Sequence, residues 1–394
     1  MAVLTTLATA DTLQATTTPQ AISCPASLPA SEKAMRVMHV DLDYVYDSDL
    51  QQMQKNVQAL TDRVIAMQVN TVFLQAYADP LGDGLVRSLY FPSRWLPMRA
   101  DLFAQTAQTL HQQANVAVYA WMPVLSFDLD PSLQRVTQWD PANPDQPAKP
   151  AKERYLRLSP FDPEARRQIK EIYQDLAKHA DFDGILFHDD AILSDFEDAS
   201  AGALTAYGTH GLPTSIAQLR DDPQNMHQWT RLKTTTLNTF TLELRDTVNA
   251  ARSKPIKTAR NMFSLPILNP QSEAWFGQNL DDFLALYDWT APMAMPLMEG
   301  VAPELAVPWL RDLVDAVAQR PNALARTVFE LQARDWSKPG QPAIQGNTLV
   351  AWMQTLQQNG ANNFGYYPDD VYKNAPDLQL IQPILCVAAS AQNH

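Results

Sequence analysis

The chain has 394 residues, with 43 Asp and Glu against 30 Lys and Arg, which gives a formal net charge of −13. Hydrophobic residues make up 46% of the sequence, a share typical of a folded globular protein, so a disordered chain or a fibre is excluded. The acidic balance argues against nucleic acid or an anionic membrane as a partner and favours a cationic or neutral ligand. No apolar stretch reaches the ~18 residues that span a bilayer.

Disulfide and metal chemistry have little support in this sequence. The two cysteines, Cys24 and Cys386, lie near opposite ends of the chain, and no CxxC motif is present. The seven histidines form neither HxxxH nor HExxH. We therefore expect no metal site and no cofactor.

Residues 1–34 differ in composition from everything that follows. They are mostly Ala, Thr, Ser and Pro, with almost no charge and no hydrophobic period. This composition predicts a disordered leader or linker, or the remnant of a signal segment. Residues 35–394 are predicted to form a single domain.

From residue 35 onward, short apolar runs alternate with amphipathic stretches. Eight runs are predicted strands, namely 37–43, 71–77, 116–124, 184–190, 260–267, 289–297, 326–332 and 363–369. Seven stretches are predicted helices, namely 49–68, 101–114, 163–179, 225–251, 279–287, 304–319 and 347–358. This alternation predicts a parallel sheet covered by helices, and eight units favour an α/β fold of the TIM-type (β/α)8 barrel class, complete or incomplete. An open doubly wound sheet is the alternative, although no phosphate-binding glycine motif follows any strand. Two long Pro- and Asp-rich stretches, 125–161 and 191–224, are predicted to be functional loops.

Active sites of such barrels lie at the carboxyl ends of the strands. The strand predicted over 184–190 ends in His188, Asp189 and Asp190. Two crowded carboxylates raise the pKa of one of them, as a general acid requires, so we expect Asp189 or Asp190 to be catalytic. The alternative is that one of the two caps the following segment. The second carboxylate is either the other aspartate of this pair or Glu330 at the seventh strand, and a core ion pair is the alternative role of Glu330.

Carboxylates and aromatics at the other strand ends have the composition of a carbohydrate groove. The predicted substrate-binding residues are Asp41, Asp43, Tyr77, Trp121, His188, Trp275, Trp336 and Tyr366. Asp41 and Asp43 alternate along a predicted strand, so we expect one face to receive both. Structural roles in the core or in strand-end ion pairs are the alternatives for these residues. Asp195, Glu197 and Asp198 are predicted to lie in a solvated loop.

Several long segments resemble one known family. They are MHVDLDYVYD, NTVFLQAYADPLGDG, SLYFPSRWLPMRADLF, VYAWMPVLSF, DGILFHDDAILSDFEDA and APMAMPLME. The chain resembles the C-terminal glycoside-hydrolase domain of the Gram-negative poly-β-1,6-N-acetyl-D-glucosamine N-deacetylase family, the PgaB/HmsF-like biofilm polysaccharide export proteins. The resemblance covers about residues 35–380.

The resemblance implies a barrel whose acidic groove binds and endolytically cleaves partly de-N-acetylated poly-β-1,6-N-acetyl-D-glucosamine. Asp189 and Asp190 match the catalytic centre, and Asp41, Tyr77, Trp121 and Trp275 match groove positions. The resemblance also implies a periplasmic or outer-membrane-associated location in a Gram-negative bacterium, with an outer-membrane export protein as a candidate partner.

The sequence departs from this family in one respect. Full-length relatives carry an N-terminal deacetylase domain with a metal site, whereas only ~35 residues precede the predicted barrel here. We therefore expect no deacetylation by this chain. The main alternative to a hydrolase is a non-catalytic polysaccharide-binding module that guides the polymer during deacetylation and export.

Overall fold

The computed structural model describes residues 34–151 and 155–387, with side chains described up to Leu385. The leader predicted over residues 1–34 lies outside the described residues except for Ala34, and so do the side chains of both cysteines.

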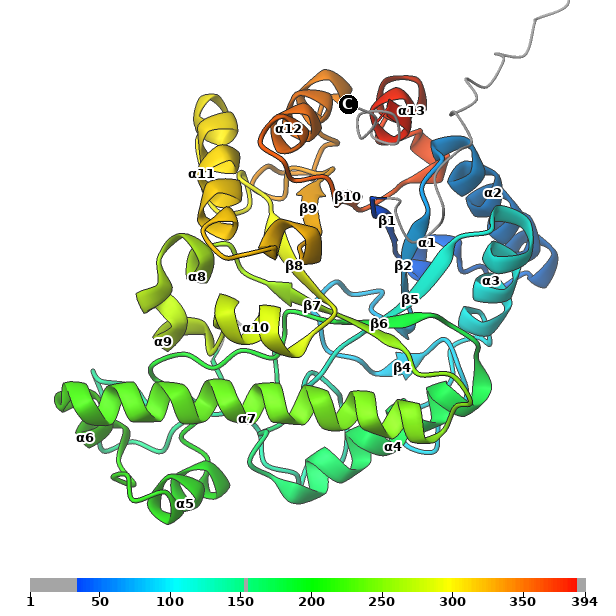
Figure 1. Cartoon of the computed structure of the whole chain (residues 1–394). Helices are drawn as coiled ribbons and strands as arrows, with labels where there is room; N and C mark the ends of the chain where they lie inside the picture. Colours follow the sequence, from blue (N-terminus) through cyan, green and yellow to red (C-terminus); the bar gives the residue numbers. More distant parts are fainter. Residues whose placement is uncertain (1–33, 152–154, 388–394) are drawn as a thin grey trace, which may run out of the picture.

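Eight parallel strands close into a barrel in the order β1-β10-β9-β8-β7-β6-β5-β2, so each barrel strand pairs with the next one along the chain (Figure 1). The strands are β1 Arg36–Val40, β2 Thr71–Gln75, β5 Ala117–Met122, β6 Gly184–Phe187, β7 Lys257–Met262, β8 Trp289–Ala294, β9 Phe329–Gln332 and β10 Phe364–Tyr367. Every predicted strand overlaps one of these. The closed (β/α)8 barrel is confirmed over the open sheet.

Helices surround the barrel (Figure 1). Their bounds are α1 Leu42–Val45, α2 Leu50–Met67, α3 Phe103–Thr109 continued by a π-helical turn Leu110–Ala114, α4 Pro163–His179, α5 Ala201–Thr209, α6 Ile216–Asp221, α7 Pro223–Ala250, α8 Leu265–Leu268, α9 Glu273–Phe276, α10 Leu280–Leu286, α11 Ala306–Ala318, α12 Gly346–Gln358 and α13 Leu378–Val387. All seven predicted helices are present with shifts of a few residues at their ends.

Two helix starts follow directly from local sequence. Asp162 accepts hydrogen bonds from the backbone N–H groups of the first turn of α4, and Pro163 occupies the first turn. Asp222 and Pro223 repeat this arrangement at the start of α7. The aspartate satisfies N–H groups that have no partner within the helix, and proline has no N–H to lose there.

Two predictions of secondary structure are corrected. The stretch 191–224, predicted to be a loop, contains α5 and α6, which pack with the start of α7 into a second small core around Tyr207 and Trp229. The strand predicted over 260–267 ends at Met262, and its last residues form α8. A short apolar run fits either state, so its periodicity alone could not separate them.

Alternate strand residues face the barrel interior and the helices. On β10, Tyr367 faces inward, with its ring 4.6 Å from that of His39, whereas Tyr366 faces outward. The hydroxyl of Tyr366 donates to Asp369, which is paired with Arg63 of α2 in the helical layer.

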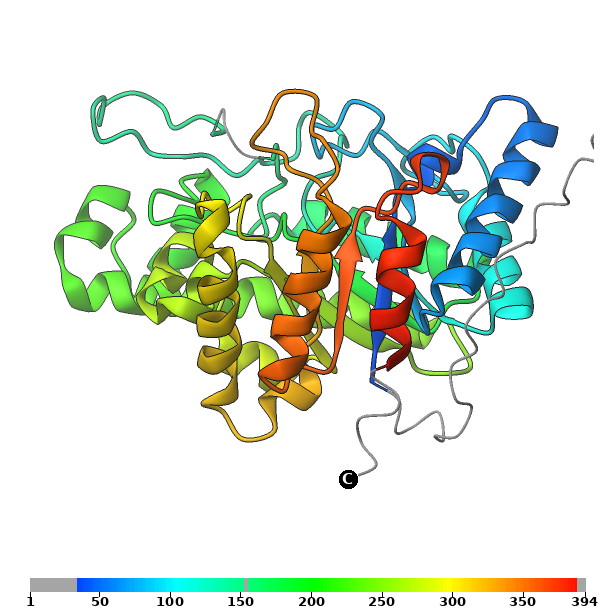
Figure 2. The same ribbon diagram turned by 90° about the horizontal axis from the view of Figure 1, so that it is seen from above.

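The carboxyl ends of the strands and their long loops share one face, at the top of Figure 2. A two-stranded ribbon, β3 Tyr77–Ala78 with β4 Ser88–Leu89, lies among these loops. β1 begins and α13 ends at the opposite face (Figure 2). The barrel mouth is thus built from loops far from either described end.

Candidate active site

An aromatic cluster lies at the mouth of the barrel, with Trp121 of β5 at its centre. The ring of Trp121 has centroid distances of 4.3 Å to His39, 5.1 Å to Tyr77, 5.2 Å to His188 and 5.6 Å to Tyr367. Trp336, in the loop after β9, stacks on Tyr367 at 5.8 Å. The rings of His39, Tyr77, Trp121 and His188 are buried, whereas those of Tyr367 and Trp336 are partly exposed. The cluster therefore meets solvent through Tyr367 and Trp336, and exposed rings of this kind suit the apolar C–H faces of sugars.

Asp189 is the carboxylate of the β6 end that retains solvent contact. Its side chain is 13% exposed, and one carboxylate oxygen lies 3.0 Å from Nδ1 of His188. The ring of Tyr155 lies 5.3 Å from that of His188, and its hydroxyl is hydrogen-bonded to Asp189. Burial would lower the pKa of His188, but Asp189 and Asp190 outweigh it and raise this pKa to about 10. The two carboxylates therefore favour the protonated form of His188, whose ring is held against Asp189.

Asp190 has a different environment from its neighbour. Its side chain is fully buried, and its carboxylate accepts the backbone N–H groups of Val124, Leu125 and Ser126 at 2.9, 2.6 and 2.7 Å. Burial opposes ionisation, but His188 and these N–H groups outweigh it and hold the pKa of Asp190 below its ordinary value. Asp190 thus anchors the loop after β5 to the end of β6, so these N–H groups belong to a segment that precedes it and not to the following segment named in the alternative.

Asp41 is a buried carboxyl beside the aromatic cluster. It is 8% exposed, and the hydroxyl of Tyr367 lies 3.3 Å from both of its carboxylate oxygens. The pKa of Asp41 is raised to about 7. Burial is the main cause, and the negative charge of Asp43 is the second. At neutral pH a large fraction of Asp41 is protonated, as a proton donor requires.

Asp43 does not share a strand face with Asp41, and that expectation is corrected. β1 ends at Val40, and Asp43 lies in the helical turn α1. Its carboxylate is used within the protein, since it accepts from the side chains of Gln75, Tyr90 and Arg99 and from the backbone N–H of Asp79. Asp43 therefore ties α1 to the neighbouring loops.

Glu330 points into the barrel from β9 and is 2% exposed. The amide of Asn261 donates to it at 2.9 Å, and Nδ1 of His39 lies 3.5 Å from its other oxygen. Glu330 is therefore buried in the core beside an amide and an imidazole, whereas its named alternative role was an ion pair. His39 connects Glu330 to the ring of Trp121.

Tyr366 and Trp275 lie outside this cluster. Tyr366 is fully buried against the helical layer, so its predicted place is taken by Tyr367. Trp275 is on α9 and is 44% exposed, and among the described residues no ring contact joins it to the cluster. The sequence reasoning missed Tyr367 and Tyr155. Strand alternation could have identified Tyr367, whereas nothing in the irregular 125–161 loop marks Tyr155.

The prediction of a solvated loop at Asp195, Glu197 and Asp198 is wrong. Glu197 and Asp198 are fully buried, and Asp195 is paired with Arg220. Glu197 is paired with Arg157 at 2.8 Å, and the side chains of Ser159 and Ser200 donate to Asp198. Except for Ser200, these partners come from distant segments, so the local charge pattern could not reveal them.

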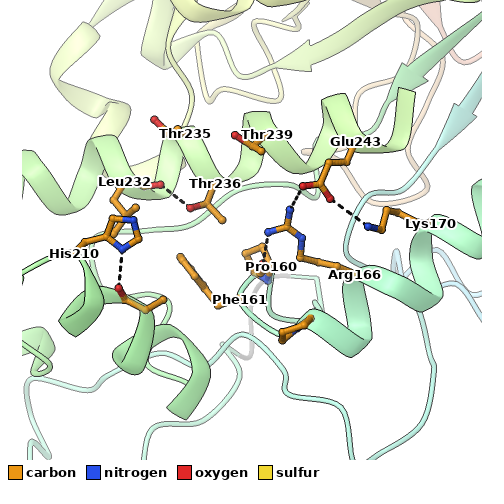
Figure 3. A pocket seen from close by; sticks show the side chains of 12 residues that line it. Pro160, Phe161, Arg166, Lys170, His210, Leu232, Thr235, Thr236, Thr239 and Glu243 are labelled. Carbon is orange, nitrogen blue, oxygen red and sulfur yellow. Dashed lines mark hydrogen bonds and ion pairs between the residues drawn. The ribbon is translucent and has the colours of Figure 1, made fainter. Parts of the chain in front are cut away.

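A cavity of about 560 Å³ lies outside the barrel, between α4, α5 and α7 (Figure 3). Glu243 on one wall is paired with Arg166 and Lys170 on the other. None of the residues lining this cavity belongs to the aromatic cluster.

Two further findings concern metals and membranes. In the described part of the chain, no group of three or more His, Cys, Asp or Glu side chains is arranged to hold a metal ion. None of the described helices has the length and apolar character that a membrane span needs.

The family model described as hypothetical glycosyl hydrolase family 13 matches residues 39–367. The chain belongs to this family. It is 52% identical over 359 residues to poly-beta-1,6-N-acetyl-D-glucosamine N-deacetylase of Escherichia coli K12, covering 91% of this chain and 53% of that protein. The chain thus spans about half the length of the curated relatives it matches.

Among solved structures, the glycoside hydrolase domain of PgaB (BpsB) from Bordetella bronchiseptica matches with a TM-score of 0.83 and 45% identity. The match covers 89% of this chain and 99% of that domain. An alpha-L-fucosidase from Paenibacillus thiaminolyticus shares the fold at 15% identity and a TM-score of 0.57, covering 91% of this chain and 49% of the fucosidase. The resemblance drawn from the sequence motifs and the prediction of a glycoside hydrolase are confirmed.

Proposed function

We propose that this chain is an endo-acting glycoside hydrolase that binds and cleaves partly de-N-acetylated poly-β-1,6-N-acetyl-D-glucosamine. Support comes from the family, from the 45% identity to the PgaB glycoside hydrolase domain and from the name of the Escherichia coli relative. The free amines of such a polymer are cations, which suits a chain of net charge −13.

The observation that carries the proposal is a pair of carboxyls with opposite surroundings at the aromatic cluster. Asp189 faces the ring of His188, whereas Asp41 is buried near other carboxylates and its pKa is raised to about 7. Two carboxyls in such different environments can divide the catalytic roles, one as the acid and the other as the base or nucleophile. Their strands, β6 and β1, are three steps apart around the barrel.

In the proposed reaction, Asp41 gives its proton to the glycosidic oxygen as the bond to the anomeric carbon breaks. Asp189, held beside His188, stabilises the positive charge on the sugar and acts as the nucleophile or as the base that activates water. Trp121 and Tyr367 lie under the sugar rings. Asp190 and Glu330, also predicted as catalytic, act instead by holding the walls of the site, because both are buried and bound within the protein.

The polymer is the proposed ligand of the cluster. A periplasmic or outer-membrane-associated location and an outer-membrane export protein as a second partner belong to the same proposal. Both rest on the resemblance of the sequence motifs, and a fractionation of cells that produce the chain would test the location.

The test is digestion of partly de-N-acetylated polymer, read by mass spectrometry for chain length and new reducing ends. Wild type, Asp189→Asn and Asp41→Asn are compared with Asp312→Asn, an exposed carboxylate on α11. Shorter oligomers from wild type and the control, lost in the other two variants, are the expected result. Binding without shortening would favour the export-guide module, and loss of acetyl groups without chain cleavage would contradict both functions.

A further inference from the structure

The loop that follows Asp190, residues 191–198, is held by cations from three separate segments. The bonds run from Arg260 of β7 to the carbonyl of Ala191, from Arg157 to the carbonyl of Ile192 and the carboxylate of Glu197, and from Lys233 of α7 to the carbonyls of Ser194 and Glu197. Backbone oxygens that a regular helix or strand would satisfy are satisfied here by charged side chains.

Lys233 is the most unusual of these cations. It projects from α7 and is fully buried. Its ammonium lies 3.7 Å from the ring centroid of Trp229 and donates to the carbonyls of Ser194 at 2.5 Å and Glu197 at 3.2 Å. A lysine without solvent costs free energy unless its nitrogen is well bonded, so these contacts must offset that cost.

The groups facing Lys233 come from two further elements. Asp195, Glu197 and Asp198 of the loop favour its charge, and Arg220 of α6 opposes it. Burial outweighs the carboxylates and lowers the pKa of Lys233 to about 7. In either protonation state the nitrogen keeps N–H groups to donate.

We propose that Lys233 is a positioning residue for the glycosidic reaction, holding loop 191–198 so that Asp189 and Asp190 keep their places at the end of β6. This inference rests on the proposed function. It assigns a role in the site to a residue of α7, a helix outside the barrel. The contacts that Lys233 makes in the described part of the chain are with Ser194, Glu197 and Trp229, none of which belongs to the cluster around Trp121.

The physical reason is that an apolar side chain of equal volume cannot donate the hydrogen bonds that the Lys233 nitrogen makes. An apolar side chain of the same length would fill the space beside Trp229 but would leave the carbonyl of Glu197 without this donor. The loop would then move, and the carboxylate of Asp190 would no longer fix the geometry of Asp189 and His188. A displacement of ~1 Å in a reacting group is enough to slow a reaction strongly.

Lys233→Met is the test variant, because it keeps the length of the side chain and removes the donor. Lys170→Met is the matched control, since Lys170 is a partly exposed lysine paired with Glu243 on the rim of the outer cavity (Figure 3). We expect kcat of Lys233→Met on the polymer to fall at least about tenfold with KM changed less than about threefold, and the control to match wild type. Hydrogen exchange should accelerate in 191–198 of Lys233→Met only.

The pH dependence of stability tests whether the nitrogen of Lys233 matters or only the volume that its side chain fills. Because the folded chain releases the Lys233 proton near pH 7 and the unfolded chain holds it to about 10.5, wild type should gain stability over Lys233→Met as the pH rises from 6 to 9. The difference between their Tm values should widen over this range. A difference that does not change with pH would overturn the assignment.

Two other results would also contradict the proposal. One is an unchanged kcat in folded Lys233→Met, and the other is a lost kcat with unchanged exchange in 191–198. If the variant does not fold, wild-type exchange is measured alone, and the protection of 191–198 relative to α4 must rise between pH 6 and 9. If wild type fails to cleave the polymer, the proposed function fails, whereas the exchange and Tm measurements still decide whether Lys233 holds the loop.

Discussion

Asp41 and Asp43 are two residues apart, yet the structure gives them opposite chemistry. Asp43 accepts from four donors, whereas Asp41, among the described residues, receives only the hydroxyl of Tyr367, at 3.3 Å. A carboxyl that is buried with so few donors costs stability whenever it is ionised. This cost is expected at a reacting group and not at a structural one.

Asp41→Asn should therefore stabilise the protein at pH 8. The folded chain keeps the Asp41 proton up to about pH 7, while the unfolded chain releases it near 3.8, so wild type loses stability as the pH rises between these values. The gain from Asp41→Asn should be ~1–4 kcal/mol at pH 8 and shrink toward pH 5. Asp43→Asn is the control and should destabilise by ~1–3 kcal/mol at both pH values. Urea denaturation at pH 5 and 8 measures both, and equal effects of the two variants would contradict this contrast.

Substitutions of the neighbours Asp189 and Asp190 should also differ in their effects on stability and activity. Asp190→Asn replaces an acceptor of three backbone N–H groups by a group that is half donor, so it should cost ~2–4 kcal/mol of unfolding free energy. Asp189→Asn should leave Tm within a few degrees of wild type while activity falls by ~100-fold or more. Calorimetry and the polymer digest, run on the same preparations, check both. A stable Asp190→Asn would show that the three N–H groups find another acceptor.

At the scale of elements, the barrel could be read from the sequence because each strand is an apolar run followed by an amphipathic helix. The site could be read only in part. The residues after β1 were expected to continue the strand and its alternation of side chains. Instead, the helical turn α1 begins directly after Asp41 and contains Asp43. The segment 191–198 looked like a polar loop because its partners, Arg157 and Lys233, lie up to about 40 residues away in the sequence. Pairings over such separations leave no trace in local periodicity.

The seam where the first barrel strand, β1, pairs with the last, β10, allows a test of the close packing between these strands. A Cβ on Gly365 would lie 2.4 Å from both the carbonyl oxygen and Cβ of Val37, so Gly365→Ala must push the two strands apart. We expect a loss of ~1–3 kcal/mol in unfolding free energy. Gly202→Ala in α5 is the control, because the three atoms nearest to its Cβ belong to the end of the Gln134 side chain, at 3.0 Å or more. It should cost less than Gly365→Ala, although Gln134 must shift slightly while it keeps its bond from the N–H of residue 202. Thermal unfolding of both variants decides, and equal Tm values would contradict the crowding at the seam.

At the scale of the whole molecule, the net charge of −13 sets how a cationic polymer approaches. Long-range attraction acts on encounter and is screened within ~8–10 Å at physiological salt. KM for partly de-N-acetylated polymer should rise severalfold between ~0.02 and ~0.3 M NaCl, whereas KM for fully acetylated, neutral oligomers should hardly change. Initial rates at several salt concentrations measure both. A salt effect of equal size on the neutral oligomers would exclude attraction to the amines as its cause.

The placement of the described chain ends has a practical consequence. β1 begins and α13 ends on the face opposite the barrel mouth (Figure 2). A tether attached where β1 begins or where α13 ends would leave the aromatic cluster pointing away from the support. The barrel can therefore be coupled to a bead or a sensor surface through this face, and a polymer too long to diffuse into a matrix could still reach the cluster from the open side.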